Sequence, residues 1–323
     1  MTENETNETN ETNETNETNE TNETNETNET NETNETNETN ETNETNETNE
    51  TNETNETNEA LTVVVGGKGK TGRRVVARLK ALGLPVRAVS PSTHVPFDWN
   101  DPSTWAAALE GAKQLYLTYH PDLAVPGAAE RVGALSRFAV AQGVEKIVLL
   151  AGRGEPQVHA AERAVKESGV ARWTVLECAF FMQNFTEGLL VPRQDVIAFA
   201  GGDVREPFVD CDDIAACAVA ALTDDRHTGK TYELTGPESL TFGEATAILG
   251  AASGRPLRFV SLSFPELGDA LAQDFPPPVV AFFLDLFGFL LDGHNAATTE
   301  GVGQMLGRPA RSLAEVAKRE VVA

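Results

Sequence analysis

The chain has 323 residues and a formal net charge of -25, with 50 acidic and 25 basic side chains. Residues 1–59 carry 20 of the acidic side chains and none of the basic ones, which leaves a net charge of -5 on the rest. This balance argues against nucleic acid as a partner. The three cysteines form no C-x-x-C pair and the histidines are not clustered, which argues against a disulfide framework or a zinc site and favours a reducing compartment.

The first segment is a repeat in which 18 copies of Glu-Thr-Asn run from Glu5 to Asn58. Because it holds no aliphatic or aromatic side chain beyond Met1, burial cannot offset the entropy of ordering, and we expect a disordered tail over residues 1–59. Each copy also contains the glycosylation acceptor Asn-Glu-Thr, so a mucin-like stalk is the alternative. No leader with a basic and an apolar region precedes the repeat, and we therefore expect a cytoplasmic protein.

Residues 61–178 alternate short β-branched runs with helical patterns. The strands are expected at 62–65, 86–89, 114–118, 146–150 and 173–176, and the helices at 72–81, 105–109, 127–142 and 157–168. Gly83, Gly143 and Gly169 stand where helices should end. This alternation predicts an α/β fold, a Rossmann-type doubly wound parallel sheet.

Beyond residue 178 the alternation is less regular. Strands are expected at 196–199 and 231–234, helices at 213–222 and 242–251, and a helical apolar segment at 264–293. We expect one domain over residues 60–323, with a core at about 60–178 and the rest of the sheet plus a small substrate lobe at 179–323. The longest apolar run, residues 279–291, contains Asp285 and is too short to span a bilayer.

The first chemical signal is the sequence of residues 63–73, in which an apolar strand leads into glycines at Gly66, Gly69 and Gly72 and then into a helix. Glycine lets the backbone approach a pyrophosphate, and the helix N-terminus holds the anion with free amides and its positive dipole end. A turn whose glycines serve only packing is the alternative. The context of strand, turn and helix favours a dinucleotide.

Several motifs together resemble the NmrA-like atypical short-chain dehydrogenases, and most closely the bacterial relatives of the festuclavine and agroclavine dehydrogenases. They are Gly-Gly-Lys-Gly-Lys-Thr-Gly at 66–72, Phe-Asp-Trp at 97–99, Trp-Thr-Val-Leu at 173–176, Phe-Met-Gln-Asn-Phe at 181–185, Pro-Phe-Val-Asp at 207–210 with Asp-Ile-Ala at 213–215, and Tyr-Glu-Leu-Thr-Gly-Pro at 232–237. The resemblance covers nearly all of residues 61–319, and it is far less specific for a substrate than for the family.

The resemblance implies a set of cofactor-binding residues. The pyrophosphate would lie on the loop and helix start, the adenine beside Asp98 and Trp99, and the nicotinamide ribose beside Thr118 and Tyr119; the loop residues are Gly66, Gly69, Lys70, Thr71 and Gly72. Asp98 can also be interpreted as a turn or N-cap residue. Phe180, Phe181 and Met182 would line the substrate side, or else belong to the core.

The end of the second strand decides which dinucleotide is preferred. Residues 86–92 contain no acidic side chain to bind a ribose 2'-hydroxyl, and the arginine that relatives often place near Pro91 is missing too. A 2'-phosphate could still be accommodated by nearby polar or basic groups, namely Ser90, Ser92, Arg87 or Lys70. We expect NADP as the cofactor, with NAD as the alternative.

The usual acid of the superfamily, a tyrosine in Tyr-x-x-x-Lys, is missing. The serine position is Ala151, and the segment His159-Ala-Ala-Glu162-Arg163 stands where the resemblance would place tyrosine and lysine. We therefore expect an NAD(P)H-dependent reductase of a preactivated acceptor, an imine, iminium or quinone-like compound, that needs little acid catalysis. His159 and His120 are the candidate proton donors. The alternative interpretation of His159 is a surface helix residue beside Glu162.

A regulatory protein that binds NADP(H) without hydride transfer is the alternative from another class, and a sugar-nucleotide epimerase would need the missing tyrosine. We expect a small-molecule substrate and a monomer or homodimer. Asp210 and Asp213 form a pair of carboxylates for which structural roles are favoured, with Asp213 as the N-cap of a helix and Asp210 as an anchor of the neighbouring loop.

Overall fold

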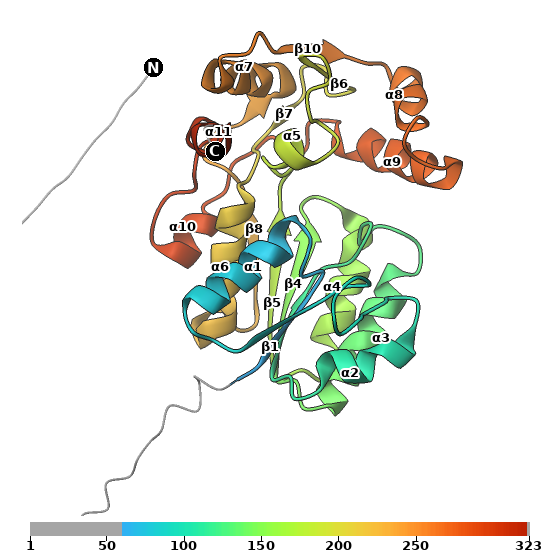
Figure 1. Ribbon diagram of the computed structural model, residues 1–323, viewed down its shortest axis with the longest axis vertical. Helices are drawn as coiled ribbons and strands as arrows, with labels where there is room; N and C mark the ends of the chain where they lie inside the picture. Colours follow the sequence, from blue (N-terminus) through green and yellow to red (C-terminus); the bar gives the residue numbers. More distant parts are fainter. Residues whose placement is uncertain (1–59, 322–323) are drawn as a thin grey trace, which may run out of the picture. The chain divides into compact units, whose positions relative to one another are not determined.

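The computed structural model describes residues 60–321. At its centre is a 6-stranded parallel sheet in the order β2-β1-β3-β4-β5-β8 (Figure 1). In chain order the strands are β1 (Thr62–Val65), β2 (Val86–Val89), β3 (Gln114–Leu117), β4 (Lys146–Gly152), β5 (Arg172–Cys178) and β8 (Lys230–Leu234). The strand order confirms the predicted Rossmann-type doubly wound sheet.

Helices cover both faces of the sheet because successive side chains of a strand point to opposite sides. Val63 and Val65 of β1 pack toward α2 (Trp105–Leu109), α3 (Ala128–Ala141) and α4 (His159–Lys166). Val64 packs on the other face, toward α1 (Lys70–Ala81) and α6 (Cys211–Thr223). Figure 1 shows these two helical layers on either side of the strands. A strand buried on both faces explains the continuous apolar run at residues 63–65.

The first five strands begin and end within two residues of their predicted positions. Gly83, Gly143 and Gly169 have φ angles of 71°, 92° and 88°, the left-handed conformation that a chain leaving a helix requires. The predicted helix at 157–168 is shorter, since a 3-10 turn at Pro156–Val158 precedes α4. The last residues before Gly169 form turns because the chain already bends toward β5 there.

The remaining elements form a smaller lobe. They are α5 (Asn184–Glu187), β6 (Val196–Phe199), β7 (Arg205–Glu206), β9 (Leu240–Thr241), α7 (Phe242–Ser253), β10 (Arg258–Ser261), α8 (Phe264–Leu271), α9 (Pro277–Leu290) and α11 (Leu313–Val321). Helix α10 (Gly301–Leu306) packs instead on α6 and β8 of the sheet. Aromatic rings fill its core: Phe180 lies 5.8 Å from Phe242 and 6.1 Å from Phe208 between ring centroids. Phe180 and the buried Met182 therefore belong to this core, the second of the two interpretations of that run.

The start of α6 corrects one detail of the expected structure. Asp210 is the N-cap, with its carboxylate accepting a hydrogen bond from the Asp212 amide, whereas Asp213 lies inside the first turn. The fully buried Asp213 carboxylate instead accepts hydrogen bonds from the side chains of Arg308 (2.6 Å) and Arg311 (2.5 Å). Both carboxylates have structural roles, but a capping oxygen must precede the helix, and only Asp210 does.

Replacing Asp213 with alanine should lower the free energy of unfolding by about 2 to 4 kcal/mol, since two arginines would lose a buried partner. Urea unfolding followed by circular dichroism measures this change. Asp203→Ala is the matched control, because Asp203 is exposed and makes no ion pair within the described residues. Equal midpoints for the two variants would contradict the structural role of Asp213.

Residues 1–59, where the repeat predicts a disordered tail, lie outside the described residues, as do residues 322 and 323. Between residues 60 and 321, no helix has both the length and the apolar character needed to cross a bilayer.

Candidate cofactor and active site

The loop between β1 and α1 is built on glycines that cannot be replaced without backbone movement. A Cβ at Gly72 would lie 2.2 Å from the Gly66 carbonyl oxygen. Gly66 itself has a φ of 71°, and a Cβ there would meet the Thr118 hydroxyl at 2.3 Å. The loop is therefore packed tightly against its own helix and against the end of β3.

The first turn of α1 offers free backbone amides. Its N-cap is Gly69, which has no side chain to cap the helix, and the first helical hydrogen bond runs from the Arg73 amide to the Gly69 carbonyl at 3.1 Å. The amides of Lys70, Thr71 and Gly72 precede that bond and have no partner in the helix. Because the first turn also contains no acidic residue, this helix start can hold an anion.

Thr118 and the glycine loop meet at the point where the strand order reverses. The chain passes from β1 to β2 at one edge and then returns to β3 on the other side of β1. In sheets of this kind ligands bind in the crevice beyond the carboxyl ends of the two strands at the reversal. The Thr118 hydroxyl donates to the Val65 carbonyl at 3.0 Å, which fixes it beside Gly66 in this crevice.

Tyr119 and Trp99 lie together, with ring centroids 4.7 Å apart. The Tyr119 hydroxyl accepts a hydrogen bond from the Arg131 guanidinium at 3.2 Å, so its orientation is fixed. The Asp98 carboxylate accepts a hydrogen bond from the Asn100 amide at 2.8 Å. That contact is typical of a turn, which favours the turn interpretation of Asp98 over a direct adenine contact.

Lys68 of the glycine loop, which the sequence motif did not single out, places a cation at the end of β2. The Lys68 ammonium donates to the Ser92 carbonyl at 2.6 Å and to the Ser92 hydroxyl at 3.1 Å. Ser90 is buried beside them, with its hydroxyl accepting from the Ser92 amide. Lys68 stands between the first two glycines of the motif, and only its position over β2 distinguishes it from the other basic residues of the loop.

Two other basic residues that were candidates for binding a 2'-phosphate make different contacts. The Arg87 guanidinium donates to the carbonyl oxygens of Ala108 and Glu110. The Lys70 ammonium donates to the Asn184 side chain at 3.0 Å, and burial lowers the pKa of Lys70. Among the predicted groups, Ser90 and Ser92 are therefore the ones that lie together with a cation at the end of β2.

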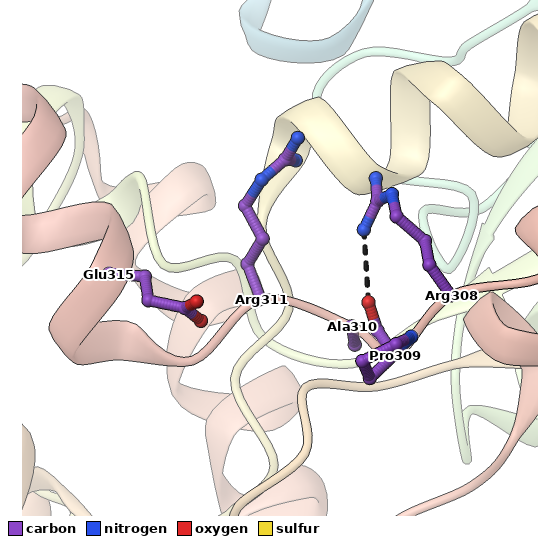
Figure 2. Close-up of a pocket in the computed structure, with 5 residues that line it drawn as sticks. All are labelled: Arg308, Pro309, Ala310, Arg311 and Glu315. Atoms are coloured by element: carbon purple, nitrogen blue, oxygen red, sulfur yellow. Dashed lines mark hydrogen bonds between the residues drawn. The ribbon is translucent and has the colours of Figure 1, made fainter.

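A cavity of about 280 Å³ lies on the segment that joins α10 and α11 (Figure 2). Its lining residues are Arg308, Pro309, Ala310, Arg311 and Glu315. Both arginines are already paired with buried carboxylates at the start of α6. The cavity contains no residue from the glycine loop or the strand ends, so it belongs to the scaffold of the lobe and not to the dinucleotide crevice.

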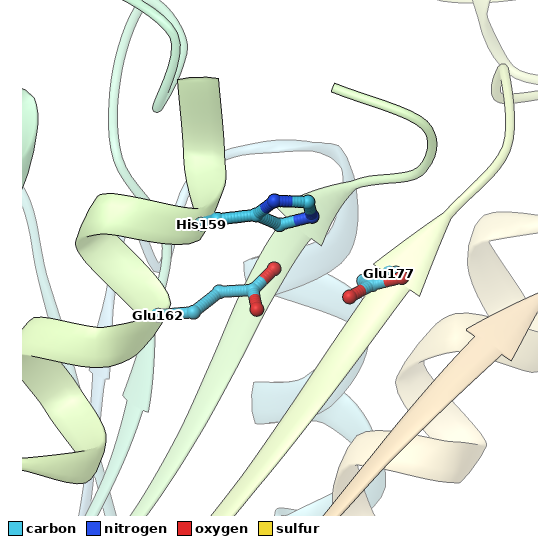
Figure 3. A group of neighbouring side chains, drawn as sticks. All are labelled: His159, Glu162 and Glu177. Atoms are coloured by element: carbon cyan, nitrogen blue, oxygen red, sulfur yellow. The ribbon is translucent and has the colours of Figure 1, made fainter. Parts of the chain in front are cut away.

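The two candidate histidines are both exposed and come from different segments. His120 follows β3. His159 begins α4 and points toward Glu162 and Glu177 (Figure 3), which agrees with its predicted position beside Glu162. Burial and the nearby Glu162 charge raise the pKa of Glu177 to about 7. His159 therefore lies among carboxylates.

Asp122 and Glu155 form a pair of carboxyl groups that the sequence did not single out. Asp122 follows β3 and Glu155 follows β4, so both stand at the same sheet edge as the glycine loop. The two groups are hydrogen-bonded to each other, and Glu155 is 5% exposed. Burial, followed by the Asp122 charge, raises the pKa of Glu155 to about 8. Burial and the neighbouring Asp122 charge therefore favour the protonated form of Glu155.

A loop of the lobe lies over the segment that carries Glu155. His294 contacts the Gly154 carbonyl oxygen at 3.1 Å, and the Asn295 side chain donates to the Arg153 carbonyl at 3.2 Å. A Cβ at Gly154 would meet the Asn295 amide oxygen at 2.2 Å. The lobe thus packs directly on the backbone of the two residues that precede Glu155.

No family model matches the chain. It is 33% identical over 270 residues to the uncharacterized oxidoreductase YesF of Bacillus subtilis, covering 79% of this chain and 93% of that protein. It is 28% identical over 285 residues to festuclavine dehydrogenase of Aspergillus fumigatus, covering 80% and 97%. An NADPH-dependent quinone oxidoreductase of Escherichia coli, whose crystal structure holds NADPH, superposes with a TM-score of 0.66 at 22% identity over 80% of this chain and 99% of that one.

The identity to the Bacillus protein extends over nearly its whole length, and the ergot-alkaloid enzyme matches over the same part of the chain. The Escherichia coli structure agrees in fold, with its sheet and lobe aligned over almost its entire chain. Together with the glycine loop at the strand reversal, these likenesses assign the chain to the NmrA-like atypical short-chain dehydrogenases/reductases, and it is an NAD(P)-dependent oxidoreductase of that family.

Proposed function

We propose that the protein is an NADPH-dependent reductase of a small, already electrophilic acceptor. The observation that carries this proposal is the meeting of the glycine loop with Thr118 at the reversal of strand order. The first-turn amides of α1 would hold the pyrophosphate, and Thr118 and Tyr119 would border the nicotinamide ribose. When bound, the cofactor supplies the hydride.

The position of Lys68 favours NADPH over NADH as the cofactor. An ammonium group beside Ser90 and Ser92 at the end of β2 matches a 2'-phosphate, and residues 86–92 offer no carboxylate for a 2'-hydroxyl. The quinone oxidoreductase from Escherichia coli, which has the same fold, is NADPH-dependent, in line with this preference.

Replacing Lys68 with alanine should weaken NADPH binding about tenfold, the cost of roughly one charge-assisted hydrogen bond, and leave NADH binding unchanged. Fluorescence titration of both reduced cofactors measures the two dissociation constants. Lys80→Ala, which removes an exposed lysine at the far end of α1, is the matched control. A parallel loss for both cofactors would show that Lys68 does not recognise the 2'-phosphate.

The acceptor is an iminium ion, an imine or a quinone. Ala151 occupies the place of the usual serine, and the usual tyrosine is replaced, so a plain ketone would receive no help from those two groups. Hydride transfer to the carbon of an iminium ion gives a neutral amine, and no proton is needed. A quinone accepts a hydride and also needs a proton to reach the hydroquinone.

Glu155 supplies that proton, and Asp122 positions it. The raised pKa keeps the Glu155 proton in place at neutral pH, and the hydrogen bond to Asp122 orients the carboxyl group. The lobe loop at residues 292–295 holds the backbone of the two residues before the acid. This assigns residues 179–323 the role of completing and covering the active site built on residues 60–178. His159 and His120 are then dispensable for proton transfer.

The proposed function is tested by following the oxidation of NADPH with a panel of quinones, cyclic imines and iminium salts. We expect turnover with at least one of these classes and none with simple aliphatic ketones. The protein would instead be a dinucleotide sensor if it bound NADPH tightly and oxidised it with no acceptor in the panel. The double variant with both His159 and His120 replaced by alanine should keep turnover.

A further inference from the structure

Three potential metal ligands meet between α4 and β5. His159 and Glu162 are three residues apart on α4 and so lie on one face of the helix, and Glu177 comes from the neighbouring strand (Figure 3). Each residue presents one ligand atom, and these atoms all lie within 4.8 Å of one another. One imidazole and two carboxylates from rigid elements are a donor set typical of divalent metal sites.

Glu162, a member of this group, has a buried oxygen without a hydrogen-bond donor. The residue is 4% exposed, and its Oε1 atom receives no hydrogen bond from any donor within residues 60–321. The other oxygen, Oε2, has Lys166 at 3.5 Å, and that ammonium is shared with the Thr231 hydroxyl. A buried carboxylate oxygen without a donor is costly, and a bound cation would remove that cost.

The surrounding charges leave the cluster in need of positive charge. Glu233, on the strand beside Glu177, raises the pKa of Glu177 further, but its own carboxylate is bound by Arg153 at 2.6 Å. Lys166 is thus the cation nearest to the two clustered glutamates, and its distance is that of a weak contact. Among the ion pairs within residues 60–321, this weak contact alone supplies positive charge to the Glu162 carboxylate.

A second group of carboxylates in residues 60–321 shows the contrast. Asp210, Asp212 and Glu320 are equally close to one another, but arginines already neutralise them. Arg319 contacts all three, at 3.2, 3.0 and 3.3 Å. That group contains no histidine and has its donors in place, so it needs no metal. The cluster at α4 differs in both respects.

We propose that His159, Glu162 and Glu177 bind a divalent cation of the zinc class. Imidazole nitrogen and carboxylate oxygen are the ligands that Zn²⁺ combines in sites with three protein ligands, where a water or a substrate atom completes the coordination. The exposed His159 leaves that position open toward solvent, and Mg²⁺, which avoids imidazole, should bind far more weakly. The site does not include Glu155, so it stands or fails independently of the proposed reductase activity.

Isothermal titration of the chelator-treated full chain with Zn²⁺ tests the site. We expect one Zn²⁺ site with a dissociation constant in the micromolar range or lower, above weak background binding to the acidic residues 1–59. Mg²⁺ should show no comparable site. His159→Ala, Glu162→Gln and Glu177→Gln should each weaken it at least about tenfold, as losses around a metal centre commonly do. Glu167→Gln removes an exposed carboxylate at the end of the same helix and should leave the site intact.

Cobalt gives a second readout that needs no activity and no buried substitution. Co²⁺ added to the full chain should produce a visible absorption band that Zn²⁺ displaces and that His159→Ala abolishes, because His159 is exposed and its loss should not unfold the protein. Binding that is unchanged in His159→Ala and Glu177→Gln would overturn the proposal. The two glutamates would then simply share a proton.

Discussion

Replacing Gly72 with alanine should weaken NADPH binding at least about 100-fold, or about 3 kcal/mol. The added Cβ would lie 2.2 Å from the Gly66 carbonyl oxygen and 2.8 Å from the Gly66 carbonyl carbon. Both are backbone atoms, so the clash cannot be relieved by rotating a side chain. The loop would have to move away from α1, and the amides that hold the pyrophosphate would lose their common orientation.

The measurement is a fluorescence titration of NADPH, with thermal unfolding recorded on the same samples. Gly288→Ala is the matched control, because a Cβ there makes only an ordinary contact at 3.9 Å within α9. Gly72→Ala should lose far more affinity than Gly288→Ala, and the unfolding temperatures show how much of that loss comes from a less stable fold. Unchanged affinity in Gly72→Ala would mean that the first turn of α1 does not bind the dinucleotide, and the proposed function would fail with it.

Replacing Glu155 with glutamine should lower kcat for a quinone acceptor by about 100- to 10,000-fold, the usual contribution of a general acid. An iminium acceptor needs no proton, so its kcat should change little in the same variant. The KM for NADPH should also stay nearly constant. Stopped-flow and steady-state oxidation of NADPH with the two acceptor classes separate a lost proton donor from a misplaced cofactor.

Glu238→Gln, which changes an exposed glutamate, should leave both acceptors unaffected and serves as the control. An equal loss of activity with quinone and iminium would show that Glu155 positions the site and does not donate a proton. No loss with either would move the proton source to solvent.

The pH dependence of kcat with a quinone acceptor should follow the titration of Glu155. Because burial and Asp122 raise the pKa of Glu155 to about 8, kcat with a quinone should be constant at lower pH and fall about tenfold per unit above pH 8. The raised pKa also means that the folded state binds this proton more tightly than the unfolded chain. Its contribution to stability is therefore complete below the ordinary value of 4.5 and is lost as the pH rises through about 8.

Both pH effects should be missing in Glu155→Gln, which cannot titrate. Urea unfolding at several pH values measures the effect on stability, and initial rates measure the effect on kcat. A pH profile that is identical in the native protein and the variant would assign the titration to another group.

The sequence was sufficient for the sheet and for the pyrophosphate loop because both depend on local patterns. Residues 63–65 are apolar on consecutive positions, as expected for a strand covered on both faces, and the glycines at 66, 69 and 72 follow at once. Gly83 and Gly143 mark helix ends through a backbone conformation that side chains disfavour. Such signals lie within a few residues of one another, so no long-range contact is needed to recognise them.

The tertiary structure was needed instead to recognise Glu155, Lys68 and the carboxylates around His159 as candidate functional groups. Asp122 and Glu155 belong to loops after different strands, and their shared proton arises only because parallel strands bring those loops to one edge. Lys68 is recognised as a candidate phosphate-binding residue only through its contact with Ser92, which follows β2. The pKa of a carboxyl group depends on burial and on charges that come from residues distant in the chain. A linear pattern could therefore identify the fold and the cofactor loop but not the proposed proton donor.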